Sequence, residues 1–279
     1  MTTSRLDRPR WWQWPTILSI DAPIVLLVWQ AAVAAAAGVA LGWPHRAVLA
    51  ASVWLAYVAD RWLEAWRLPA SIVRTPRHAF YQRRRWPVAV VGVVILAADI
   101  AVATTTLPAG DLVAGSWLAL AAACYVLSHQ WLHRTARWRV PKELVITVLL
   151  AAGVWLFVRQ GAVAVVRPIV GLFALLVLTN ISLISAWEVD VDRRHGQSSL
   201  ALHSTAAYRW IPLLPWVAAF VALVIAIAGA PDVRAVAACA LASALLLVAS
   251  NRMERYTGWP LARVASDLAL LTPLALILR

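Results

Sequence analysis

Three carboxylates close a long apolar stretch of the chain: Glu188, Asp190 and Asp192. Glu188 and Asp192 are four residues apart, so on a continuing helix they share one face, where like charges repel unless a cation lies between them. A second acidic pair with the same spacing, Asp60 and Glu64, ends an earlier apolar stretch. Carboxylate oxygens are the preferred ligands of Mg²⁺, which also binds water and substrate phosphate. The two pairs together therefore predict a metal and diphosphate site.

The residues beside Asp60 and Glu64 leave a simpler alternative open. Arg61 and Arg67 lie on the same predicted helix and could neutralise the two carboxylates as ordinary ion pairs. A carboxylate near the end of an apolar helix is costly without a partner, so either interpretation explains why cations accompany it. The second acidic group favours the metal site, because acids from two helices supply enough oxygen ligands for a divalent cation.

A basic segment follows the first acidic pair. Arg74, Arg77 and His78 are near the acids along the chain, and they are the better candidates for contacts with a diphosphate. The three arginines at 83–85 stand directly before the next apolar stretch. For this run, contact with anionic lipid headgroups is the favoured interpretation.

The composition is that of a membrane protein. Of the 279 residues, 62% are hydrophobic, the mean hydropathy is +0.75, and the charges gather between long apolar stretches. The formal charge of +12 could suggest nucleic acid, but in a membrane protein excess arginine reports orientation and contact with anionic lipid. We therefore expect membrane lipid, and no nucleic acid, among the partners. Cys124 and Cys239 both lie in apolar stretches and predict no disulfide or metal pair.

Nine apolar stretches approach the length of about 20 residues that a membrane-spanning helix needs. The sequence thus predicts an all-α membrane protein with nine transmembrane helices in a single domain, 1–279. The two acidic pairs each end a span and precede a basic segment, which also suggests a faint parallel repeat. The predicted spans cover residues 18–41, 45–66, 86–107, 111–132, 143–159, 165–187, 210–229, 232–250 and 260–278.

The basic residues alternate between rich and poor connections, which predicts the orientation. With a cytoplasmic N-terminus, the inside segments contain Arg5, Arg8, Arg10, Arg67, Arg74, Arg77, Arg83, Arg84, Arg85, Arg134, Arg137, Arg139, Lys142, Arg193, Arg194, Arg209, Arg252 and Arg255. The outside segments contain Arg46, Arg159, Arg167, Arg234 and Arg279. Both acidic groups then lie on the cytoplasmic side, and a bacterial cytoplasmic membrane is the expected location.

Most of the chain resembles the UbiA superfamily of intramembrane prenyltransferases, whose members have nine spans and two Asp-rich motifs on the cytoplasmic side. The sharpest resemblance is residues 188–200, which read Glu-Val-Asp-Val-Asp-Arg-Arg-His-Gly-Gln-Ser-Ser-Leu. The second motif of the family has an acid, three residues, Asp, then Gly and a Ser or Thr before Leu. By this match Glu188 and Asp192 take the metal-ligand places, and Asp190 stands where an additional acid is common.

The other family motifs are matched with substitutions. The first motif has Asn, then Asp four residues on, then Asp four further, and this chain has Ala56, Asp60 and Glu64 there. The motif of Tyr, three residues and Lys is matched by Tyr125 and His129. A permanent cation is thereby replaced by a titratable one.

The resemblance implies transfer of an isoprenyl group from a prenyl diphosphate to a hydrophobic or aromatic acceptor, with Mg²⁺ assisting departure of the diphosphate. The implied catalytic residues are Asp60, Glu64, Glu188 and Asp192, and Asp190 joins them in the metal site. The implied or candidate substrate-binding residues are Arg74, Arg77, Tyr125, His129, Asn180 and Arg193. Two alternatives remain open on the same scaffold: a terpene cyclase or diphosphate-releasing lyase, and a non-catalytic or transport protein.

Three further polar residues lie inside predicted spans. Asn180, two turns before Glu188, is expected to face the same cavity, with an interhelical hydrogen bond as the alternative. Asp99 and Asp267 have no spacing that indicates a metal, so we expect them to form hydrogen bonds that pack helices together.

Overall fold

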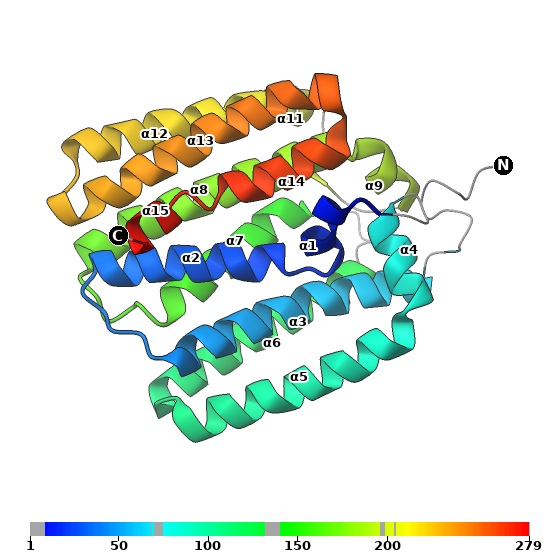
Figure 1. The fold of residues 1–279 in the computed structure, drawn as a ribbon, viewed down its shortest axis with the longest axis horizontal. Helices are drawn as coiled ribbons and strands as arrows, with labels where there is room; N and C mark the ends of the chain where they lie inside the picture. Colours follow the sequence, from blue (N-terminus) through cyan, green and yellow to red (C-terminus); the bar gives the residue numbers. More distant parts are fainter. Residues whose placement is uncertain are drawn as a thin grey trace. The chain divides into compact units, whose positions relative to one another are not determined.

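The computed structural model describes residues 9–67, 69, 75–131, 140–195, 199–203 and 205–278. Every regular element in these ranges is a helix, which confirms the all-α prediction for the described chain (Figure 1). Short 3₁₀ segments cover Trp11–Gln13 and Ile211–Leu213. The α-helices are α1 Trp14–Ile17, α2 Asp21–Ala36, α3 Trp43–Arg67, α4 Pro76–Arg83, α5 Arg85–Thr106, α6 Ala109–Trp131, α7 Lys142–Leu156, α8 Val163–Trp187, α9 Val189–His195, α10 Leu200–His203, α11 Thr205–Trp210, α12 Leu214–Ala228, α13 Pro231–Thr257, α14 Trp259–Ala269 and α15 Leu274–Ile277.

Helical segments occur near all nine predicted spans, but fewer of them meet the length and composition of a membrane span. Within the described residues six helices do so, or seven if the bent pair Trp11–Ile17 and Asp21–Ala36 forms one span. Helix α7 is short, at 15 residues. Helix α3 has 25 residues but contains Arg46, Asp60, Arg61 and Glu64. Nine membrane crossings therefore stay a prediction.

Helix α5 shows most directly that the chain is an integral membrane protein. Its 22 residues have a mean hydropathy of 2.3 in the best window, and none of that window is buried inside the protein. Val90, Val93 and Ile100 each expose more than half of their surface. An apolar face of this length is not stable in water, whereas a bilayer core matches it.

The chain divides into two compact units, and each takes segments from several parts of the sequence. Unit 1 contains the described residues of 9–24, 44–131 and 190–195, and thus α1, α3 to α6 and nearly all of α9. Unit 2 contains 25–43, 140–189 and the described residues from 199 onward. The single-domain prediction stays a prediction.

Polar contacts between helices join α3, α5 and α6 in unit 1. The Ser52 hydroxyl donates to Asp99 Oδ2 at 2.8 Å, which confirms the prediction that Asp99 packs helices together. Near the start of α3, His45 Nε2 lies 3.3 Å from Oδ2 of Asp111 on α6. An aspartate inside an apolar helix is costly unless a neighbouring helix supplies a partner, so these contacts help to fix the order of the three helices.

Arg61 fixes the N-terminal turn of unit 1. Its guanidinium donates to Thr16 O at 3.3 Å and also to the Ser19 hydroxyl, and Ser19 Oγ lies 2.8 Å from Tyr81 Oη. Ser19 has a φ of 60°, an uncommon value for a residue with a side chain. The chain bends by 75° between Ile17 and Asp21. The hydrogen bonds of Arg61 therefore go to this turn and not to Asp60 or Glu64, which corrects the ion-pair alternative for Arg61.

Unit 2 is a bundle in which α8 contacts α7, α12, α13 and α14, and Figure 1 shows these long helices running side by side. Helix α2 joins it through Trp29, which is fully buried. The Trp29 ring packs at a tilt against Phe173 of α8, with ring centroids 5.3 Å apart, and its indole N–H donates to Leu270 O at 2.8 Å. Helix α14 also contacts α8, and the second acidic motif begins at the C-terminal end of α8.

We predict that α5 crosses the membrane, so that its two flanking positions face opposite sides. Arg84→Cys and Ala109→Cys, introduced into a protein lacking Cys124 and Cys239, should be labelled from the cytoplasmic side and the outside respectively, because arginine is enriched at the Arg84 end. The measurement is labelling of intact cells with a membrane-impermeant maleimide before and after permeabilisation.

Leu96→Cys is the matched control, since Leu96 lies in the middle of α5 with 46% of its surface exposed and should be shielded by lipid. Labelling of positions 84 and 109 from the same side would contradict the predicted crossing.

Candidate functional site

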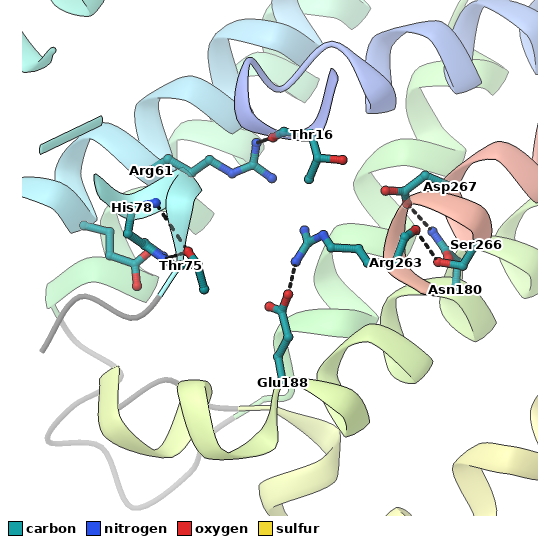
Figure 2. Close-up of polar contacts among 10 residues, drawn as sticks. Thr16, Arg61, Thr75, His78, Asn180, Glu188, Arg263, Ser266 and Asp267 are labelled. Carbon is teal, nitrogen blue, oxygen red and sulfur yellow. Dashed lines mark hydrogen bonds and ion pairs between the residues drawn. The ribbon is translucent and has the colours of Figure 1, made fainter. Parts of the chain in front are cut away.

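The first acidic motif lies at the end of α3, in unit 1. Glu64 is 3% exposed, and its Oε2 lies 2.9 Å from Nε2 of His78 on α4. The Thr75 hydroxyl, which caps the start of α4, lies 2.5 Å from Nδ1 of the same ring. A carboxylate can only accept, so Nε2 of His78 carries the hydrogen that points to Glu64. His78, a candidate for diphosphate contact, thus holds the acid in a fixed orientation (Figure 2).

The second acidic motif begins where α8 ends, in unit 2. Glu188 is the C-cap of α8, and its backbone N–H still donates to Ile184 O at 2.9 Å. The backbone leaves the α-helical region at this residue, and α9 starts at Val189. Glu188 and Asp192 therefore do not lie on one continuous helix, which is the condition under which their spacing would place them on one face. The physical reason is that α8 closes at Glu188, whose side chain turns to a partner on α14.

That partner is Arg263. Its Nη1 lies 2.5 Å from Glu188 Oε1, and the two side chains are 13% and 7% exposed. Figure 2 shows the guanidinium directed at the carboxylate. A buried carboxylate requires a cation or several donors, and Arg263 supplies the cation. The sequence analysis did not identify this residue, although an arginine inside an apolar span, four residues before an aspartate, was a usable indication.

The remaining acids of the second motif lie on α9 and differ in exposure. Asp192 is buried, at 4% exposure. Asp190 and Arg193 form a pair with each other at 2.9 Å, with side chains 75% and 66% exposed. A pair this exposed contributes little to stability, so both side chains remain available to a ligand. Unit 1 contains Asp192 together with Asp60 and Glu64, and Figure 1 shows α4 and α9 at the same end of that unit.

Asn180 and Asp267 connect α8 to α14 within unit 2. The Asn180 amide donates to Asp267 Oδ1 at 2.9 Å, and Figure 2 shows the two side chains meeting. The packing role predicted for Asp267 is confirmed, and Asn180 makes the interhelical hydrogen bond that was its alternative. A role of Asn180 in binding substrate stays a prediction.

Tyr125 and His129 lie one turn apart on α6, in unit 1. Their rings stack, with centroids 5.6 Å apart and planes at 23°. The His129 side chain is largely buried, with 9% of the residue exposed. Contact of either ring with a diphosphate stays a prediction.

Glu143 is a buried acid that sequence analysis missed. It lies in the first turn of α7 and is fully buried, and its Oε2 accepts a hydrogen bond from Leu200 N at 3.0 Å. Leu200 is the last residue of the stretch that resembles the family motif. Glu143 therefore ties the end of that stretch to α7. The two residues are 57 positions apart in sequence, so local spacing does not reveal the contact.

The donor set suits a hard cation in its chemistry, since every candidate ligand is a carboxylate oxygen. Within the described ranges, however, no three His, Cys, Asp or Glu side chains form a group that could hold a metal ion. Glu64 and Glu188 instead interact with His78 and Arg263. Arg74 lies outside the described residues.

We predict that Glu143→Leu lowers stability, because it removes the acceptor of a part-buried backbone N–H. The loss should be about 1–3 kcal/mol of unfolding free energy. Glu143→Gln keeps an acceptor oxygen and should be milder. Thermal unfolding of the detergent-solubilised protein measures both, and a Leu variant as stable as the unmodified protein would contradict the tether.

Comparisons with known proteins bear on the fold. No protein-family model matches the chain, and no curated protein matches it. Among solved structures, the chain is similar to the apo structure of a UbiA homolog from Aeropyrum pernix K1, with a TM-score of 0.61 and 18% sequence identity. The likeness covers 93% of this chain and 99% of that one. At this identity the comparison establishes architecture, so the chain has the fold of a UbiA homolog, as its motifs predict.

Proposed function

We propose that this protein is an intramembrane prenyltransferase, which transfers an isoprenyl group from a prenyl diphosphate to a hydrophobic or aromatic acceptor. The observation that carries the proposal is the burial of Glu64, Glu188 and Asp192 at the two motif positions of a chain with the UbiA fold. Buried acids at the ends of apolar helices are costly, and a cationic ligand is a common reason to keep them.

The acids are the proposed binding site for Mg²⁺. Asp60, Glu64, Glu188 and Asp192 would hold it, with Asp190 as an additional ligand. When bound, Mg²⁺ supplies positive charge that stabilises the diphosphate as it leaves. Arg77, part-buried on α4, and Arg193, exposed on α9, add guanidinium donors for the phosphate oxygens, and Arg74 is proposed for the same role.

The apolar helices are the proposed binding site for the isoprenyl tail. Breaking the allylic C–O bond leaves an isoprenyl cation, which water would capture unless the surrounding side chains exclude it. An electron-rich carbon of the acceptor then attacks the cation and loses a proton. Tyr125 and Asn180 are proposed to orient these substrates from α6 and α8.

The proposed location is a bacterial cytoplasmic membrane, with the N-terminus and the acids on the cytoplasmic side. The arginine distribution supports this orientation.

The first test is metal-dependent binding of a prenyl diphosphate to the detergent-solubilised protein. Binding should require Mg²⁺ and should be lost in Asp60→Ala and Asp192→Ala, because each removes a proposed ligand. The matched control is Asp232→Asn, because Asp232 is an exposed acid at the start of α13. This variant should bind the prenyl diphosphate like the unmodified protein. Undiminished binding in EDTA would remove the metal from the proposal.

The products then separate the candidate activities. Release of diphosphate without an acceptor would favour a cyclase or lyase, and binding without turnover would favour a non-catalytic protein.

The second test concerns His129, which stands where the family has Lys. If its imidazolium contacts the diphosphate, donor affinity should fall as pH rises through the range in which this imidazole loses its proton. His129→Lys should flatten this pH dependence, and His129→Ala should lose about 1.5–3 kcal/mol of binding free energy. Affinities measured from pH 5.5 to 8.5 decide the point, and identical profiles for all three proteins would exclude the contact.

A further inference from the structure

Arg263 places a permanent positive charge on an acid that the proposed function assigns to the metal. Nη1 of Arg263 lies 2.5 Å from Glu188 Oε1, and both side chains are largely buried. A guanidinium is charged at every physiological pH. In the absence of ligand, Glu188 is therefore already neutralised by the protein itself.

This contact opposes metal binding at Glu188. A divalent cation and a guanidinium at the same carboxylate repel each other, and the repulsion is strong where little water screens it. A metal ion that coordinates Glu188 must therefore displace Arg263 or share the acid at a cost. Displacement leaves a buried guanidinium without its anion, which is itself unfavourable.

A diphosphate removes that cost. Arginine presents parallel N–H donors whose spacing matches two phosphate oxygens, and such charge-assisted bonds are stronger than neutral ones. A metal–diphosphate complex could thus take over both partners of the ion pair: the metal ion binds Glu188, and the phosphate oxygens accept from Arg263.

The turn of α14 that carries Arg263 makes one hydrogen bond within the helix and is followed by one to α8 of unit 2. The Ser266 hydroxyl donates to Arg263 O at 2.8 Å, and Asp267 is bonded by Asn180 of α8 at 2.9 Å, as Figure 2 shows. The Asn180–Asp267 bond joins α14 to α8 one turn from Arg263, and the Arg263 side chain extends from α14 to Glu188.

We propose that Arg263 is a diphosphate-binding residue that also makes metal binding at Glu188 depend on the diphosphate. The inference rests on the proposed function and deepens it by assigning a residue outside the acidic motifs. Because coupling between two ligands is reciprocal, metal should tighten diphosphate binding by the same factor by which diphosphate tightens metal binding.

The experiment measures Mn²⁺ binding by electron paramagnetic resonance, with and without inorganic pyrophosphate, and pyrophosphate binding by calorimetry. In the unmodified protein, pyrophosphate should tighten Mn²⁺ binding about tenfold or more, within the usual range of coupling. In Arg263→Gln, Mn²⁺ alone should bind more tightly than in the unmodified protein, pyrophosphate should bind more weakly, and the coupling should shrink. Glu188→Gln should weaken Mn²⁺ binding in both conditions, because it removes a proposed ligand.

Two further variants keep the test interpretable. Arg263→Lys keeps the charge but lacks the planar pair of N–H donors. Mn²⁺ alone should therefore bind as in the unmodified protein, while pyrophosphate binds more weakly. This variant provides the test if Arg263→Gln does not fold. Arg234→Gln removes an exposed arginine at the start of α13 and should change neither ligand.

The outcomes separate the two proposals. Coupling in Arg263→Gln as strong as in the unmodified protein would overturn the role of Arg263. If only Arg263→Lys folds, pyrophosphate binding equal to that of the unmodified protein would do the same. Either result would leave the prenyltransferase proposal standing. Absence of metal-dependent pyrophosphate binding in the unmodified protein would overturn both.

Discussion

Acidic side chains that are removed from water need a partner, and this requirement governs the polar interior of the protein. In unit 1, Asp99 accepts from Ser52 and Glu64 is held by His78. In unit 2, Glu188 binds Arg263, Asp267 binds Asn180, and Glu143 accepts from Leu200 N. Because apolar packing between lipid-facing helices is weakly directional, these contacts specify which helices lie together.

The fold could largely be predicted because its main determinant is local. A stretch of about 20 apolar residues needs a helix to satisfy its backbone in a membrane, whatever its neighbours are. Helices α5, α8 and α13 follow from this rule alone. The rule is weaker for α7, which is short, and for α3, whose charged residues lower its hydropathy. The bend before α2 depends on Ser19 and Arg61, which are 42 positions apart, and could not be predicted from the sequence.

The candidate site was predicted in its residue types but not in its contacts. The spacing of Glu188, Asp190 and Asp192 identified the acids, and the packing role of Asp99 followed from its position inside a span. The partners of Glu64 and Glu188 did not follow, because Arg263 is 75 positions from Glu188. The break between α8 and α9 is equally invisible to an i,i+4 pattern, which assumes that the helix continues.

The exposed face of α5 has a consequence for engineering. Because the apolar window of this helix buries none of its residues against the rest of the protein, its sequence is constrained by hydrophobic thickness more than by the shape of any neighbour. Asp99, bonded to Ser52, is the exception. The outward face of α5 is therefore a suitable place for a spectroscopic probe, an affinity handle or a wholesale exchange of valine, leucine and isoleucine, with little disturbance to the acids on α3.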